Sequence, residues 1–254
     1  MAVGLGCMFG IKMPLNFNSP YKARSIADFW RRWHISLSRF LRDYLYIPMG
    51  GSRRGKVRQY LNLMTTMLLG GLWHGAGWTF VFWGALHGLY LCVNHAWARL
   101  SRKWQWAQPR GITAGAYHVI TFLAVVVGWV FFRAKTFGAA VSIVKGMCGM
   151  NGIALPYTAA NVVKRLGLNS VQVGFTGVDT SMLAVISILL LIVFTMPNTQ
   201  EITRLARPTI ERVCSRSRLL VWRPSVGWAV AAGLVLSLAM LRLNRVSEFL
   251  YFQF

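Results

Sequence analysis

Apolar side chains fall into long runs that short basic segments separate. Residues 112–132 form a run of 21 with His118 as its one ionisable side chain, and residues 180–196 and 226–241 form uncharged runs of 17 and 16. A helix that crosses a bilayer needs about 20 predominantly apolar residues, with a lower limit near 17. The pattern therefore predicts one clear spanning helix, two shorter ones, and an integral membrane protein.

An amphipathic basic helix is predicted ahead of these runs. Ser25 stands three residues before Asp28, as in a helix-start capping box, and the helix should continue to about Ile47, where Pro48 stops it. Arginines would occupy one face, and the other face is apolar, with Trp30, Trp33, Leu37, Phe40, Leu41 and Tyr44. We expect this helix to lie along lipid headgroups. His34 falls beside the apolar face, where packing between helices explains it better than chemistry does.

The stretch from Leu69 to His95 places histidines in apolar, glycine-rich sequence. Glycines around His74 argue against a continuous helix there, because glycine weakens helix interiors. The run 61–72 is too short to span upright, so we expect it to be broken or re-entrant, and 78–93 should resume as a helix. One face of that helix would be polar, with Trp83, His87, Tyr90 and Asn94. Beside it, Gly84 and Gly88 form a GxxxG pair that would allow another helix to pack closely.

The remaining segments are simpler. Residues 131–147 predict a short interfacial amphipathic helix, and 149–179 predict an ordered loop outside the bilayer core. The closing FLYFQF is an aromatic cluster suited to a membrane interface. Residues 1–13 resemble the tail of a spanning helix, so we expect the chain to begin in mid-architecture.

The net charge of +22 does not indicate a nucleic-acid partner, because the Lys and Arg residues lie between the apolar runs. If 61–72 and 78–93 form an in-and-out pair, 20 of the 28 basic residues fall in 14–60, 99–111 and 197–225, on one side of the membrane. Another 7 fall in 133–180 and 242–254, on the other side. This bias places the more basic side in the cytoplasm, where anionic lipids attract it.

Few kinds of chemistry fit the remaining polar residues. The six acidic residues lie outside the three apolar runs, which argues against a carboxylate relay and against paired-carboxylate glycoside chemistry. Zinc is not expected, because the sequence has no HExxH motif and no CxxC. The sequence also has no P-loop for a nucleotide and no GxSxG motif of a serine hydrolase. A Ser-His-Asp triad formed by residues far apart in the sequence stays an alternative, although no motif identifies its serine. The alternatives for His74 are a general base of lowered pKa in an apolar surround, and structural packing.

Long motifs carry a resemblance. Residues 16–51 (NFNSPYKARSIADFWRRWHISLSRFLRDYLYIPMGG) and 62–88 (NLMTTMLLGGLWHGAGWTFVFWGALHG) resemble the membrane-bound O-acyltransferase family, as do WVFFRAKTF at 129–137 and the closing FLYFQF. Within it the chain is most similar to bacterial alginate-type polysaccharide O-acetyltransferases and, more distantly, to the D-alanyl transfer protein of lipoteichoic acid modification. Family members carry further spanning helices before the first motif, so the resemblance implies the C-terminal part of the architecture.

The resemblance implies catalytic roles for two histidines. His74 in the LWHG motif would deprotonate or orient the accepting hydroxyl, and His34 in the RWHxSLS motif would line the reaction centre and steady the developing charge. His87 fits the same motifs but is better explained by helix packing. Further support or tunnel positions are Trp73, Trp30, Trp33, Ser36, Asn62, Trp83 and Asn94. No cofactor is expected to stay bound, and acetyl-CoA or an acyl carrier would be the donor.

Together these observations predict an all-α integral membrane protein, a multi-spanning bundle with re-entrant and amphipathic interfacial helices. It would form a single membrane domain over 1–254, with 16–95 as the catalytic-motif region. We expect a multi-pass O-acetyltransferase of the bacterial inner membrane that modifies an exported polysaccharide such as alginate or cellulose. Its partners would be lipids, periplasmic acetylation proteins and the polymer. The rival interpretation is a non-catalytic scaffold or export subunit, or an inactive fragment.

Overall fold

The computed structural model describes residues 2–105, 110–150, 180–211, 213 and 220–242. Within these ranges the regular elements are helices, and extended pairing is limited to an isolated bridge between Met13 and Thr209. The longer helices are α4 (Lys56–Trp73), α5 (Trp78–Lys103), α6 (Ile112–Arg133), α7 (Phe137–Met147), α9 (Thr180–Thr195) and α11 (Val226–Arg242). The shorter ones are α1 (Ala2–Met8), η1 (Pro20–Lys22), α2 (Ile26–Arg32), α3 (Ile35–Leu41), η2 (Arg42–Tyr46), α10 (Thr199–Ile202) and η3 (Arg204–Ala206).

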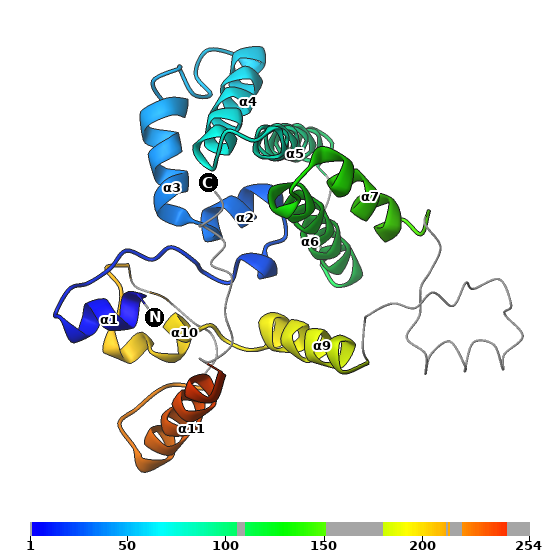
Figure 1. Cartoon of the computed structure of the whole chain (residues 1–254). Helices are drawn as coiled ribbons and strands as arrows, with labels where there is room; N and C mark the ends of the chain where they lie inside the picture. The colour runs from blue at the N-terminus through cyan, green and yellow to red at the C-terminus, as the bar shows by residue number, and fades with distance from the viewer. Residues whose placement is uncertain (1, 106–109, 151–179, 212, 214–219, 243–254) are drawn as a thin grey trace, which may run out of the picture. The chain divides into compact units, whose positions relative to one another are not determined.

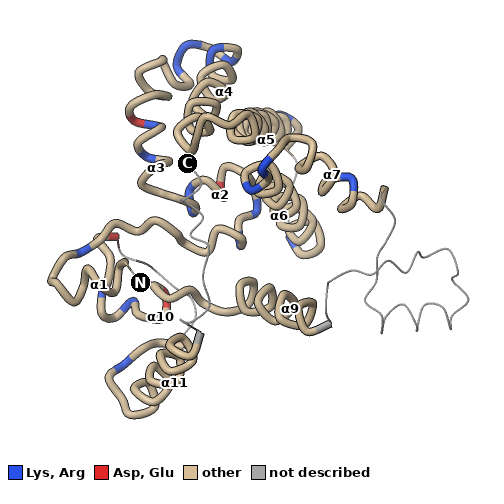
Figure 2. The backbone as a smooth tube through the Cα atoms, in the orientation of Figure 1, with Lys and Arg blue, Asp and Glu red and all other residues tan. Residues whose placement is uncertain are grey.

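The chain divides into two compact units. One comprises residues 19–196, and the other comprises residues 1–18 together with 197–254. In the larger unit α4 and α5 form an antiparallel pair, α6 packs against α5, and α2 contacts both α5 and α6 (Figure 1). Lys and Arg residues in this unit lie mostly at helix ends and in connecting loops (Figure 2).

The prediction of a single amphipathic helix over 25–47 is wrong, because the range is divided between separate helices. Its beginning is as predicted, because the Asp28 N–H donates to the Ser25 hydroxyl at 3.1 Å. The helix then ends at Arg32, and a second helix begins at Ile35. Trp33 is extended, with φ −106° and ψ 130°, so the two halves take different directions and one helical wheel does not describe both.

The expected break inside 61–72 is also wrong, because α4 continues through this run as one helix of 18 residues. The break that the glycines around His74 predicted is confirmed: α4 ends at Trp73 and α5 begins at Trp78. The predicted GxxxG packing is confirmed as well. A Cβ atom added at Gly84 would lie 2.4 Å from the Met67 carbonyl oxygen, and one added at Gly71 would lie 2.4 Å from that of Phe80.

One helix in the described ranges, α6, is long and apolar enough to cross a membrane, which confirms the long apolar helix predicted at 112–132. The helices at the other two apolar runs, α9 and α11, are shorter, with 16 and 17 residues. The interfacial helix expected over 131–147 begins later, at Phe137, after the Thr136 hydroxyl accepts a hydrogen bond from the Ala139 N–H at 3.1 Å. Most of the loop expected at 149–179 and the whole FLYFQF cluster lie outside the described residues.

Candidate active site

The break between α2 and α3 sets the backbone of His34 in an unusual conformation. Its φ and ψ are 42° and 55°, in the left-handed region that residues other than glycine rarely adopt. Such a conformation costs on the order of 1–3 kcal/mol and persists only when the surrounding packing imposes it. The ring of Trp33 supplies that packing, because it stacks on Phe29 at 5.8 Å and meets Trp129 edge to face at 4.8 Å. The strained residue is therefore one of the two predicted catalytic histidines.

His74 lies at the other helix break in this unit. It follows the last residue of α4, and its N–H donates to the Gly71 carbonyl at 3.0 Å. Gly75, which comes next, has φ 152°, so the chain leaves the helix directly after the histidine. The imidazole is thus presented from a short loop between two long helices and not from a regular helical face.

Aromatic rings surround the His74 imidazole, and one of them also contacts His34. The His74 ring meets Trp73, Trp83 and Phe132 edge to face, at centroid distances of 4.9, 5.3 and 5.0 Å. The Trp73 ring also meets His34 edge to face, at 6.3 Å. The structure therefore brings His34 and His74 together around the ring of Trp73, although 40 residues separate them in the sequence.

Burial lowers the pKa of the His34 imidazole, and a hydrogen bond with the backbone opposes this. An ordinary histidine has a pKa of about 6.5 and is mostly neutral at pH 7, the form in which it accepts a proton.

A second aromatic group lies behind this pair. Trp30, Trp83 and His87 contact one another, with ring centroids 4.9 to 5.8 Å apart. His87 is 2% exposed, and a Cβ atom on Gly128 would lie 2.7 Å from its Nε2 atom. This fit against α6 supports the packing role predicted for His87, and Trp83 links it to the ring of His74.

The two predicted asparagines hold the backbone. The buried Asn62 donates through Nδ2 to the carbonyls of Met49 and Gly51, at 3.2 and 3.0 Å, and fixes the turn before α4. Asn94 accepts the Ala27 N–H at 3.2 Å and ties α5 to the beginning of α2. They support the bundle around the histidines without a ring contact to either. The remaining predicted residue, Ser36, is exposed in the first turn of α3.

Sequence reasoning missed two residues of α6. Phe132 contacts the His74 ring directly, and Trp129 lies 4.8 Å from Trp33 and 6.5 Å from Trp83. Both belong to the motif WVFFRAKTF at 129–137, which carried part of the resemblance. The signal was present, but it was used only to recognise the family and not to assign site residues.

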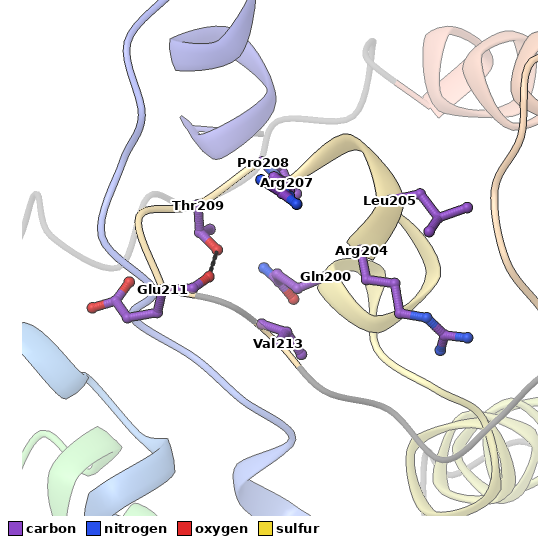
Figure 3. Close-up of a pocket in the computed structure, with 8 residues that line it drawn as sticks. All are labelled: Gln200, Arg204, Leu205, Arg207, Pro208, Thr209, Glu211 and Val213. Carbon is purple, nitrogen blue, oxygen red and sulfur yellow. Dashed lines mark hydrogen bonds between the residues drawn. The ribbon is translucent and has the colours of Figure 1, made fainter.

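The smaller unit has a separate cavity of about 300 Å³, between α10 and the segment that follows η3. At its edge the Thr209 hydroxyl donates to the Glu211 carbonyl at 2.8 Å (Figure 3). The Glu211 carboxylate accepts a hydrogen bond from the Leu15 N–H at 2.7 Å, which connects this segment to the irregular segment around Leu15. The residues that line the cavity include no predicted site residue: Gln200, Arg204, Leu205, Arg207, Pro208, Thr209, Glu211 and Val213.

Chemically, the larger unit offers a neutral, half-buried imidazole with a second imidazole nearby and aromatic walls. Such a group can take a proton from a hydroxyl, and the apolar walls strengthen its electrostatic interactions. In the described residues no cluster of three or more His, Cys, Asp or Glu side chains is placed to hold a metal ion. The two neighbouring imidazoles favour acid–base chemistry.

The chain is similar to several named proteins. The chain is 52% identical to the peptidoglycan O-acetyltransferase of Helicobacter pylori over 155 residues, which are 61% of this chain and 29% of that protein. It is 40% identical to the probable alginate O-acetylase AlgI of Pseudomonas putida over its whole length, which corresponds to 49% of that protein. It is 32% identical to the teichoic acid D-alanyltransferase of Bacillus subtilis over 143 residues, 54% of this chain and 36% of that protein.

The chain thus spans half or less of the length of these relatives. The sequence model of the membrane-bound O-acyltransferase family matches residues 1–134, more than half of the chain. The matched region contains His34 and His74, the helix break at which each of them lies, and α6 with its contact to His74. This chain belongs to the membrane-bound O-acyltransferase family.

Proposed function

We propose that this chain carries the reaction centre of an O-acetyltransferase that acetylates a hydroxyl of an exported polysaccharide. The hydroxyl oxygen would attack the carbonyl carbon of an acetyl thioester while His74 accepts the hydroxyl proton. The C–S bond then breaks, and the imidazolium returns the proton to the departing thiolate. The polysaccharide leaves as an acetyl ester and the donor as a free thiol.

The observation that carries this proposal is the meeting of His74 and His34 around Trp73. A histidine that only fills space would not need a left-handed backbone, and His34 has one. In the proposed reaction His34 stabilises the negative charge that develops on the carbonyl oxygen, or orients the acceptor, as preorganised hydrogen-bond donors do elsewhere. His74 would act in its neutral form, which an imidazole mostly has near pH 7.

The names of the relatives indicate a class of acceptor. They act on alginate, on peptidoglycan and on teichoic acid, which are cell-envelope polymers rich in hydroxyl groups. We propose a polymer of this class as the acceptor, with alginate or acetylated cellulose as the leading examples. The donor would be acetyl-CoA or an acetylated carrier protein on the cytoplasmic side, and periplasmic acetylation proteins would receive or position the product.

The proposed membrane arrangement follows from the helices. The long α6 would span the inner membrane, α4 and α5 would enter it as a hairpin with His74 at the tip, and α9 and α11 would supply further spans. The His74 site would then lie within the membrane, within reach of a thioester from one side and a hydroxyl from the other. This is a multi-pass arrangement with one re-entrant hairpin.

The test is a matched pair of substitutions in the complete acyltransferase, expressed in cells that lack their own copy. His74→Gln should reduce polymer O-acetylation by roughly 10²-fold or more, the usual contribution of a general base. His95→Gln, the same change on α5 at a position without a ring contact to either site histidine, should leave acetylation near the wild-type level. Ester content per sugar is measured on the isolated polymer, with protein levels matched by immunoblot.

Normal acetylation with His74→Gln would exclude the proposed reaction and favour a scaffold or export subunit, since packing tolerates glutamine at a half-buried position. Equal loss in both variants would mean that any change near α5 disturbs the fold, and the catalytic assignment of His74 would then be withdrawn.

A further inference from the structure

An open groove runs between α5 and α6, beside the beginning of α2, away from the two catalytic histidines. Its volume is about 660 Å³. Several of its apolar side chains are exposed, including Leu89, Val93 and Ile120, although α5 and α6 pack directly against each other (Figure 1). Exposed apolar side chains that line one contiguous groove mark a binding surface more often than they do when scattered singly.

A second cavity, of about 490 Å³, lies at the beginning of α6 and is lined by Arg24, Arg110, Gly111, Ala114, Gly115 and His118. Arg24 lines both this cavity and the groove, so the two are neighbours. One end of the combined surface is therefore cationic, and the rest is apolar.

The two arginines are available to a ligand. Both are exposed, and among the described residues neither guanidinium forms an ion pair. The nearest carboxylate in the sequence, Asp28, is paired with the Arg32 guanidinium at 2.9 Å. No acidic side chain lines either cavity. Two uncompensated guanidinium groups at one cavity favour a phosphate, which they can bind through several charge-assisted hydrogen bonds.

The beginning of α6 adds to this preference. Its N-cap is Gly111, which has no side chain to accept the helix's free N–H groups. The positive end of the dipole of this 22-residue helix therefore faces the cavity that the two arginines line.

The groove carries a marker of membrane depth. Inside it, Trp97 donates through Nε1 to the Tyr117 hydroxyl at 2.7 Å. Tryptophan and tyrosine gather at the level of lipid headgroups, where one part of each ring is apolar and another is polar. The groove continues from this pair along α6, the helix that is long and apolar enough to span.

We propose that this surface binds an anionic phospholipid of the phosphatidylglycerol type. Its phosphate lies between Arg24 and Arg110 at the beginning of α6, and an acyl chain follows the α5–α6 groove past Ile120 towards Ala124. Charge decides the occupant: a packed helix would fill the groove but leave two guanidinium groups without partners, whereas an anionic lipid satisfies both parts of the surface.

Native mass spectrometry of the purified full chain in detergent tests this. The probes are 1-palmitoyl-2-oleoyl-phosphatidylglycerol and the phosphatidylcholine with the same acyl chains. The wild-type chain should bind the anionic lipid more tightly, and Arg24→Gln with Arg110→Gln should weaken that binding by roughly 10- to 30-fold, as expected for two basic groups on an anionic headgroup. The control pair Arg53→Gln with Arg54→Gln, in the exposed loop before α4, should retain wild-type affinity.

A third variant, Ala116→Trp, fills the groove and leaves the arginines in place, at an exposed position where a larger ring causes no burial strain. This variant should bind the anionic lipid more weakly than the wild type does. In a separate competition experiment, inorganic phosphate at millimolar concentration should fail to displace the lipid from the wild-type chain. Equal affinity for the two lipids, equal loss in both arginine pairs, or wild-type binding by Ala116→Trp would each overturn the proposal. Circular dichroism confirms that every variant retains its helices.

Discussion

At the scale of single residues, the conformation of His34 is the feature that the sequence did not predict. Tryptophan and histidine are acceptable in helix interiors, so nothing at positions 33 and 34 indicates a break. The break results from tertiary packing: Trp33 stacks on Phe29 and meets Trp129 edge to face, and Trp129 lies on α6, almost 100 residues later in the chain. Local propensity cannot report such a contact, whereas the motif resemblance did identify His34 and His74 as a pair.

Replacing His34 with glycine or with alanine distinguishes the effect of its backbone conformation from the effect of losing its imidazole. Alanine in the left-handed region costs about 1–2 kcal/mol, while glycine adopts that region freely. We expect His34→Gly to be more stable than His34→Ala by about 1 kcal/mol in detergent, measured by chemical unfolding, although both lose the imidazole and most of the acetyl transfer. Equal stability of the two variants would mean that the left-handed conformation is absent from the folded protein.

At the scale of elements, the α4–α5 hairpin was predicted in part. The GxxxG pair on α5 indicated close packing, and Gly84 does lie against the backbone of α4. The expected break within α4 rested on the short length of the run 61–72, and it is wrong because the helix already begins at Lys56. Gly71 lies against Phe80 and does not end the helix. Glycine in a helix indicates either a weak point or a close approach, and only the partner helix distinguishes the two.

Gly84→Ala tests this packing. Its Cβ atom would lie 2.4 Å from a backbone carbonyl oxygen, so the two helices must separate, at a cost of about 1–3 kcal/mol in stability. The matched control is Gly138→Ala in α7, where a Cβ atom would meet nothing within 4 Å and alanine should be neutral or stabilising. Thermal unfolding in detergent compares them. Equal midpoints for Gly84→Ala and the wild type would mean that α4 and α5 are not so closely packed.

At the scale of the whole molecule, the apolar runs predicted the helical class and the position of α6, while the number of spans stays a prediction. The runs at 180–196 and 226–241 do form helices over most of their length, yet these are shorter than α6. The length and composition of a helix decide whether it can span a membrane. The distribution of Lys and Arg decides which connecting loops lie on the cytoplasmic side. The excess of 20 basic residues over 7 indicates that side.

Cysteine labelling tests the predicted sides. In a chain whose other cysteines are replaced by serine, Cys148, which is exposed just after α7, should react with a membrane-impermeant maleimide added outside spheroplasts. Ser52→Cys, in the basic loop before α4, should react only after the membrane is opened, because its segment belongs to the cytoplasmic side. The reverse pattern would invert the topology, and labelling of both from outside would exclude α6 as a span between them.

The most direct test of the account is whether His34 and His74 act as one unit. Single-turnover acetyl transfer is measured with the purified complete acyltransferase in nanodiscs, for His34→Gln, for His74→Gln and for the double variant. Residues that work as a unit give non-additive losses. We predict that the double variant is about as slow as His74→Gln alone. If the two losses multiply instead, the histidines act independently and the shared reaction centre around Trp73 is wrong.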